Sequence, residues 1–130
     1  MSQVFVYGTL RTGASNAFRM KGASSLGSAT VSAKLYRVHD DFPGIVLSNN
    51  SEDVLLGEVF TGVSNEHLHA LDVYEGCDAQ MPVSERIYRR ILAPVILESG
   101  EVAEAFIWEY IREVDERERI VSGDWLAQSI

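Results

Sequence analysis

The sequence predicts an α+β or barrel-like domain rather than a doubly wound sheet. Six strand-like segments are present, and only one convincing helix interrupts them, so helices do not alternate with strands as a doubly wound sheet requires. The 130 residues match the size of one domain, and a hydrophobic content of 46% is enough for a core. No repeat or linker divides the chain, so residues 1–130 are expected to form a single domain.

The strands are expected where apolar and β-branched residues run or alternate between turn-forming residues. They are predicted at 4–7, 29–38, 44–47, 54–61, 86–97 and 102–110. Gly57 inside the fourth segment indicates a bulge or close packing, and Pro94 interrupts the fifth. The Ser99-Gly100 pair predicts a hairpin turn between the last two.

One helix is predicted at 66–75. Ser64 or Asn65 is suited to the N-cap position, and Gly76 is suited to the position that follows the last helical residue. A shorter helix is expected near 16–21.

The net charge of −8 repels phosphate backbones, so nucleic acid is not expected as a partner. No apolar run has membrane-spanning length, and no secretory signal is visible, so no membrane association is expected. A single cysteine, Cys77, is consistent with a reducing cytoplasm. We therefore expect a cytoplasmic protein.

The segment 4–13 reads as a buried strand that runs into a glycine-bearing loop. Gly8 permits close approach of another group, and Thr9 and Arg11 add polar contacts. Exposed backbone N–H groups at such a strand end form a cradle for a small anion or carboxylate; a plain surface turn is the alternative. Nucleotide binding is disfavoured because neither GxxxxGK[ST] nor GxGxxG occurs.

Glu75 is the residue most suited to proton transfer. Leu68, Leu71 and Glu75 share one face of the predicted helix, so the carboxylate is expected on the buried side. Lost hydration then raises its pKa toward neutrality. Two alternatives stay open: escape of Glu75 to solvent past the last turn, or pairing with an arginine such as Arg86, Arg89 or Arg90.

No metal site is expected. His67 and His69 lie two residues apart, roughly 200° around a regular helix, and His39 is isolated in a loop. Cys77 lies beside Glu75 and Asp78, whose charges raise the pKa of a thiol, so we interpret it as a packing residue.

Several segments, taken together, resemble the γ-glutamylcyclotransferase-like family. The segment FVYGTLR at 5–11 resembles the signature loop of the family. The segment LDVYEG at 71–76 resembles the family segment that carries the catalytic glutamate. Further similarities are FPG at 42–44, YRR at 88–90, AFIWEY at 105–110 and SGDWL at 122–126. The order is that of the family over nearly the whole chain, most like its small bacterial members.

The resemblance implies a compact mixed β-barrel with flanking short helices, with a pocket at one end formed by the 7–10 loop. It implies a cofactor-independent cyclotransferase, of transferase or lyase type, that converts a γ-glutamyl amine or γ-glutamyl peptide to 5-oxoproline plus free amine. Glu75 is then the general acid and base. The substrate-binding residues are expected to be Tyr7, Gly8, Thr9, Leu10, Arg11, Pro43, Gly44, Tyr88 and Tyr110.

Some roles stay open within that expectation. Backbone N–H groups of the 7–10 loop hold the substrate carboxylate or a developing oxyanion. Arg11 either anchors this loop or meets substrate, and Tyr88 and Tyr110 either orient Glu75 or serve as core aromatics. The outer wall at 42–45 and 77–85 is expected to select the leaving amine.

Other functions on the same scaffold are also considered. One is a cyclotransferase that releases a γ-glutamyl cap from a carrier-linked amine. Another is a non-catalytic module that binds a small carboxylate metabolite, and a third is a structural partner in an assembly. A monomer or homodimer is expected, with a small molecule as its binding partner.

Overall fold

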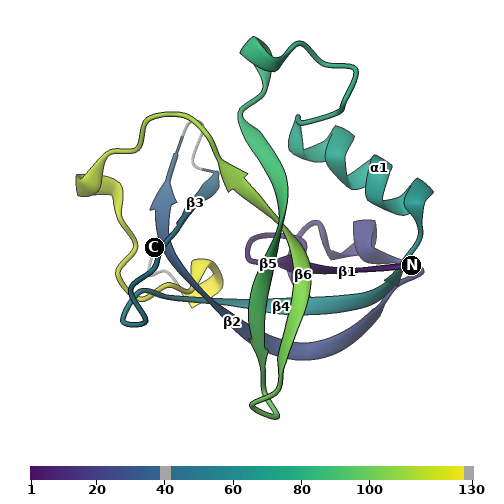
Figure 1. Cartoon of the computed structure of the whole chain (residues 1–130), viewed down its shortest axis with the longest axis horizontal. Coiled ribbons are helices and arrows are strands. Elements are labelled where there is room, and N and C mark those ends of the chain that lie inside the picture. The colour runs from purple at the N-terminus through teal and green to yellow at the C-terminus, as the bar shows by residue number, and fades with distance from the viewer. Residues whose placement is uncertain (39–41, 128–130) are drawn as a thin grey trace.

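The computed structural model describes residues 1–38 and 42–127, whose strands close into a mixed barrel (Figure 1). The strands are β1 (Ser2–Val6), β2 (Ser24–Arg37), β3 (Pro43–Leu47), β4 (Val54–Val63), β5 (Tyr88–Leu97) and β6 (Val102–Tyr110). Their order is β3-β2-β4-β1-β6-β5, and a pairing of β2 with β5 closes the barrel, leaving β3 as an extension of β2. Among the described strands only β1 and β6 pair in parallel, so the predicted mixed barrel of the α+β class is confirmed.

The one α-helix in the described residues, α1 (Asn65–Glu75), has the end residues that the sequence predicted. The Ser64 hydroxyl oxygen accepts a hydrogen bond from the His67 N–H at 3.1 Å, so Ser64 is the N-cap. Gly76 ends the helix with φ 74°, a left-handed conformation that glycine adopts without strain. The helix therefore begins one residue earlier than predicted and ends as predicted.

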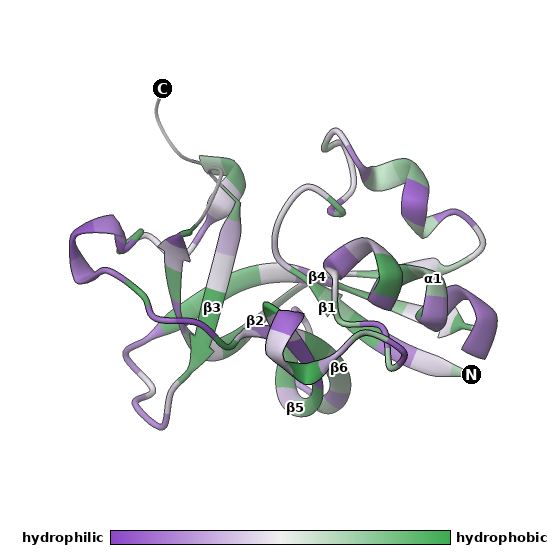
Figure 2. Cartoon of the chain, turned by 90° about the horizontal axis from the view of Figure 1, so that it is seen from above, coloured by the Kyte–Doolittle hydropathy of each residue, from purple (hydrophilic) through white to green (hydrophobic). Residues whose placement is uncertain are grey.

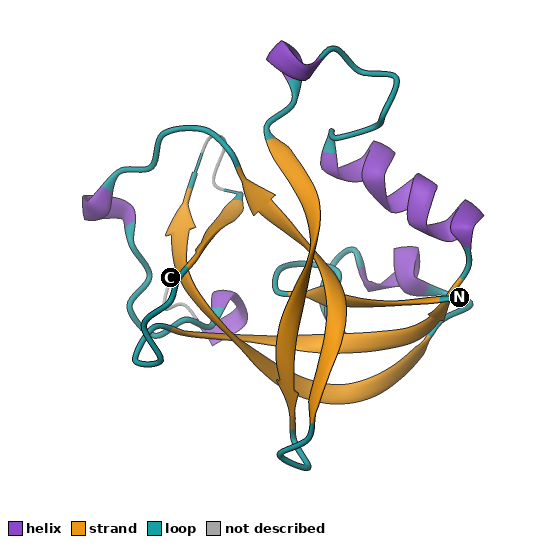
Figure 3. Ribbon diagram, in the orientation of Figure 1, coloured by secondary structure: helices purple, strands orange, loops and turns teal. Residues whose placement is uncertain are grey.

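The shorter helix predicted at 16–21 is a single 3₁₀ turn at Ala17–Met20. The Asn16 side chain does not cap this turn, since its amide donates to the Thr9 hydroxyl at 2.9 Å. Other 3₁₀ turns lie at Val83–Glu85, Glu116–Glu118 and Trp125–Ala127 (Figure 3).

The strand boundaries differ from the prediction mainly at two places. The second strand begins at Ser24 instead of residue 29, because its small polar first half pairs with β4 across a bulge before Gly27. The fifth begins at Tyr88 instead of residue 86, because the turn Val83–Glu85 precedes it. Gly57 pairs regularly with Ala29, and a Cβ there would run into the Phe5 ring, so close packing is its role.

Alternation along β1 divides the core into two clusters. Phe5 faces the barrel interior, while Val4 and Val6 face the layer between the barrel wall and α1. Leu68 and Leu71 fill that outer layer from the helix, which carries both polar and apolar residues in Figure 2. This packing places the C-terminal end of α1 beside the loop that follows β1. None of the helices in the described ranges is long and apolar enough to cross a membrane.

Candidate functional site

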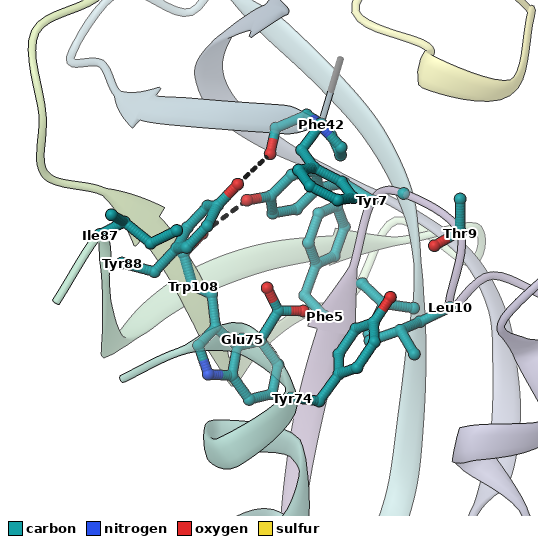
Figure 4. A pocket seen from close by; sticks show the side chains of 13 residues that line it. Phe5, Tyr7, Thr9, Leu10, Phe42, Tyr74, Glu75, Ile87, Tyr88 and Trp108 are labelled. Carbon is teal, nitrogen blue, oxygen red and sulfur yellow. Dashed lines mark hydrogen bonds between the residues drawn. The ribbon is translucent and has the colours of Figure 1, made fainter. Parts of the chain in front are cut away.

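A cavity of about 130 Å³ opens where β1 and α1 end (Figure 4). It is lined by Phe5, Val6, Tyr7, Gly8, Thr9, Leu10, Phe42, Pro43, Tyr74, Glu75, Ile87, Tyr88 and Trp108. Within this described lining Glu75 is the only carboxylate, and its side chain points in among the aromatic rings. The predicted acid and the predicted glycine loop therefore share one cavity.

Burial shapes the chemistry of Glu75. The loss of hydration, with a smaller contribution from the negative charge of Asp72, raises its pKa to about 7. A carboxyl that titrates near neutrality both accepts and returns a proton efficiently. The helix face deduced from Leu68 and Leu71 thus gives the correct side for Glu75, and the alternative, escape of its side chain to bulk solvent, does not occur.

The arginines that were alternative partners for Glu75 all bind elsewhere. Arg86 donates to backbone carbonyls, including that of Met81 at 2.9 Å. Arg89 pairs with Glu109 at 2.6 Å, and Arg90 pairs with Asp72 at 2.9 Å. In the described part of the chain no ion pair joins Glu75 to any of them.

The 7–10 loop has a defined backbone shape. The Arg11 N–H donates to the Gly8 carbonyl at 3.2 Å, and the Asn16 N–H donates to the Thr9 carbonyl at 2.9 Å. Among the residues that the structure describes, the N–H groups of Gly8, Thr9 and Leu10 have no internal acceptor. These donors are thus available to an anionic ligand group.

Side chains on both flanks hold this loop in place. The Thr12 N–H donates to the Glu58 carboxylate at 2.7 Å, and the Thr12 hydroxyl donates to the same group. These bonds, together with the Ser25 hydroxyl, keep the pKa of Glu58 below its usual range against the opposing effect of burial. Glu58 is therefore a charged anchor outside the cavity lining.

Arg11 lies on the other flank of the loop. Its guanidinium pairs with Asp124 at 2.7 Å, and both side chains are largely buried. Of the two roles left open by the sequence, this geometry favours the anchoring of the loop, because Arg11 is not part of the cavity lining.

Two tyrosines close one side of the cavity. The Tyr7 hydroxyl donates to the Trp108 carbonyl at 2.7 Å, and the Tyr88 hydroxyl donates to the Pro43 carbonyl at 2.6 Å. Burial raises the pKa of both phenols well above the ordinary value, so both stay protonated at neutral pH. They act as hydrogen-bond donors and wall residues.

The structure brings together seven of the ten predicted site residues: Tyr7, Gly8, Thr9, Leu10, Pro43, Glu75 and Tyr88. Arg11, Gly44 and Tyr110 lie outside the lining. Gly44 allows β3 to approach β6, since a Cβ there would lie 3.1 Å from the Tyr110 ring. Tyr110 packs edge-on against Tyr88, with the ring centroids 5.5 Å apart. Of its two predicted roles, this contact favours that of a core aromatic residue.

Six lining residues were not among the predicted catalytic and substrate-binding residues, although one of them, Phe42, lies in the predicted outer wall at 42–45: Phe5, Val6, Phe42, Tyr74, Ile87 and Trp108. Phe5, Val6, Phe42 and Tyr74 lie in the motifs at 5–11, 42–44 and 71–76. They are next to Tyr7, Pro43 and Glu75, and this adjacency could have identified them as cavity residues. Trp108 is part of the motif at 105–110 but reads as a core residue. Nothing in the sequence singles out Ile87.

No set of three His, Cys, Asp or Glu side chains in the described ranges is arranged to hold a metal ion. His39 lies outside the described residues. Cys77 is buried, and burial together with Asp72 raises the pKa of its thiol to about 12. That thiol is not a nucleophile near neutral pH.

Known structures resemble this one over most of its length. YkqA from Bacillus subtilis matches 95% of the chain at 25% identity with a TM-score of 0.71, and the chain spans 39% of its length. The uncharacterized protein PH0828 from Pyrococcus horikoshii matches 96% of the chain and 90% of its own length at 28% identity, with a TM-score of 0.66. An AIG2-like protein from Mus musculus shares the fold, with a TM-score of 0.72, 23% identity and coverage of 89% of this chain and 81% of its own.

A search of curated protein sequences gives no significant match. The model of the family described as "Gamma-glutamyl cyclotransferase, AIG2-like" matches residues 4–127. This range contains the glycine loop, Glu75 and all the strands of the barrel except the first residues of β1. The chain therefore belongs to the gamma-glutamyl cyclotransferase, AIG2-like family, as the resemblance predicted.

Proposed function

We propose that this protein is a cofactor-independent cyclotransferase that converts a γ-glutamyl amine or γ-glutamyl peptide to 5-oxoproline and a free amine. The observation that carries the proposal is the position of Glu75. A carboxyl whose pKa is raised to about 7 shares a cavity with free N–H groups of the 7–10 loop. Family membership supports the same class of reaction.

The size of the cavity supports a small reacting group. About 130 Å³ suits the glutamyl part of a substrate, while the leaving amine extends past Phe42 and Ile87, two exposed apolar residues of the lining. The free N–H groups of Gly8, Thr9 and Leu10 then hold the glutamyl α-carboxylate or the developing oxyanion.

Ring closure is an intramolecular reaction, so the enzyme gains rate mainly by folding the substrate into a reactive shape. Glu75 removes a proton from the α-ammonium, and the freed α-nitrogen attacks the γ-carbonyl carbon to form the new C–N bond. The attacking nitrogen then passes its second proton to water, the bond from that carbon to the amine nitrogen breaks, and Glu75 returns the first proton to the leaving nitrogen. Such acid–base help contributes about 10²–10⁴-fold in rate.

The test is a panel of γ-glutamyl amines and γ-glutamyl peptides assayed for 5-oxoproline release. Glu75→Gln keeps the shape of the side chain but removes its proton chemistry, so it should lower turnover about 100-fold or more. Glu66→Gln is the matched control, because Glu66 is an exposed glutamate in the first turn of the same helix. Turnover by the Glu75→Gln protein at the wild-type rate would remove Glu75 from the mechanism.

A second candidate is a non-catalytic module that binds a small carboxylate metabolite. The N–H groups of Gly8, Thr9 and Leu10 favour it, since they are available to a carboxylate without any contribution from Glu75. This candidate is supported if no member of the panel releases 5-oxoproline while 5-oxoproline or glutamate itself raises the melting temperature.

A monomer or homodimer that acts in the cytoplasm is part of the proposal. Gel filtration combined with light scattering measures the oligomeric state directly.

A further inference from the structure

Asp72 is a buried carboxylate with several donors directed at it. Its side chain accepts hydrogen bonds from the Trp108 indole N–H at 2.9 Å and from the Arg90 Nε at 2.9 Å and 3.1 Å. The Cys77 thiol lies 3.6 Å from the same carboxylate. Only 8% of Asp72 is exposed, so these contacts fix the orientation of the group.

Two structural links connect Asp72 to Glu75. The two residues lie three apart on α1, so they occupy neighbouring places on one helix face. Trp108 forms the second link. Its side chain lines the cavity, and its indole N–H donates a hydrogen bond to Asp72. Its backbone carbonyl accepts a hydrogen bond from the Tyr7 hydroxyl. Asp72 itself does not line the cavity.

We propose that Asp72 is a positioning residue for Glu75: it lies one turn away on the same helix face, and its bonds to Trp108 and Arg90 hold the end of α1 against the cavity wall. Through its charge, Asp72 also acts on the Glu75 carboxyl. Only the catalytic meaning of this inference rests on the proposed function. The charge effect itself is a property of the folded chain and is measurable without any substrate.

The other titratable groups near Glu75 do not produce the effect that the Asp72 charge has on its carboxyl. The titratable groups on which Glu75 acts are Tyr7, Cys77 and Tyr88, and Tyr74 lines the same cavity. Glu109 and Tyr110 act on these tyrosines, and Arg90 pairs with Asp72. Burial raises the pKa of Tyr7, Tyr88 and Cys77, so these three stay neutral near pH 7. Glu109 is paired with Arg89 at 2.6 Å. Burial is the larger cause of the raised pKa of Glu75, and among the described residues Asp72 is the one charge that adds to it.

The experiment is an NMR titration of the free protein with ¹³C-labelled glutamate carboxyl groups. The signal that disappears in Glu75→Gln identifies Glu75, and its shift gives the pKa. In the wild type we expect about 7. In Asp72→Asn the value should fall by about one unit or more but stay above the ordinary 4.5, since burial remains. In Glu66→Gln it should not move.

A double variant separates charge from packing. Asp72→Asn leaves the Arg90 cation unpaired, whereas Asp72→Asn with Arg90→Met removes both charges of the buried pair and is the variant expected to fold best. Its Glu75 pKa should lie between the Asp72→Asn and wild-type values. If Asp72→Asn does not fold, the double variant carries the test, with a value below the wild type expected.

The outcomes separate the two proposals. A Glu75 pKa that stays at the wild-type value in both Asp72 variants overturns the inference, because a merely structural Asp72 moves stability and not this titration. A lowered pKa in a protein whose wild type releases no 5-oxoproline upholds the charge effect and removes only the proposed reaction. Where there is turnover, the acid limb of kcat/KM should move to lower pH together with the NMR value.

Discussion

The Tyr88 hydroxyl donates a hydrogen bond of 2.6 Å to the Pro43 carbonyl and so joins the start of β5 to the start of β3 across the cavity. The two residues are far apart in sequence, and both line the cavity. This bond fixes one wall of the space into which Glu75 points (Figure 4).

Tyr88→Phe removes this bond and little else. We expect KM for a γ-glutamyl substrate to rise several-fold with kcat nearly unchanged, and the free energy of unfolding to fall by about 1 kcal/mol. Steady-state kinetics and urea unfolding check both. Tyr110→Phe is the matched control, because no hydrogen bond of its hydroxyl is found in the described chain. Equal effects of the two substitutions would contradict this role for the Tyr88 hydroxyl.

Gly8→Ala should distort the cavity mouth. A Cβ at Gly8 would lie 2.8 Å from Cγ of Pro43, so the proline wall has to move outward. Overpacking of this kind costs about 1–3 kcal/mol, and we expect turnover to fall at least about tenfold while the fold persists. Circular dichroism with the 5-oxoproline assay tests both parts. Wild-type kinetics in the Gly8→Ala protein would show that this contact does not shape the site.

The raised pKa of Glu75 predicts how stability depends on pH. The folded carboxyl titrates near 7 and the unfolded one near 4.5, so the folded state binds more protons between these values. Ionisation of Glu75 therefore lowers stability as the pH rises through that window. Glu75→Gln removes this loss. Relative to wild type, its free energy of unfolding should gain about 3 kcal/mol above pH 7 and nothing below about pH 4.

Urea unfolding at several pH values measures this difference. Glu66→Gln serves again as the control, because its exposed carboxyl should give no such pH-dependent gain. A stability difference between Glu75→Gln and wild type that is the same at every pH would contradict the burial of an ionisable Glu75.

The Arg11–Asp124 pair should contribute to stability because it is shielded from solvent. The side chains are 13% and 22% exposed, whereas those of the surface pair Arg117–Asp115 are 89% and 46% exposed. A double-mutant cycle with Arg11→Met and Asp124→Asn should give a coupling free energy of about 1 kcal/mol or more, and the same cycle on the surface pair should give about zero. Equal coupling in the two pairs would show that Asp124 does not anchor the 7–10 loop.

Local patterns in the sequence predict much of this structure. Ser64 and Gly76 predict the ends of α1, because caps act within one turn, and Leu68 and Leu71 predict the side on which Glu75 lies. The strands are recognised from apolar runs, although the first half of β2 is missed because its residues are small and polar. Family membership and the barrel follow from the motifs.

Contacts between distant segments could not be predicted in the same way. The parallel pairing of β1 with β6 and the bond from Trp108 to Asp72 join residues that no periodicity connects. Arg11 was an open choice for the same reason, since its partner Asp124 lies near the other end of the sequence. Ile87 reaches the cavity only because of where the turn before β5 places it.

The most direct test of proton transfer by Glu75 is the pH dependence of kcat/KM for the best γ-glutamyl substrate, measured over roughly pH 5 to 9. The account predicts that kcat/KM rises along an acid limb with an apparent pKa near 7, and that Glu75→Gln has no such limb and retains about 1% of the activity or less. An unchanged acid limb in the Glu75→Gln protein, with activity close to wild type, would contradict it.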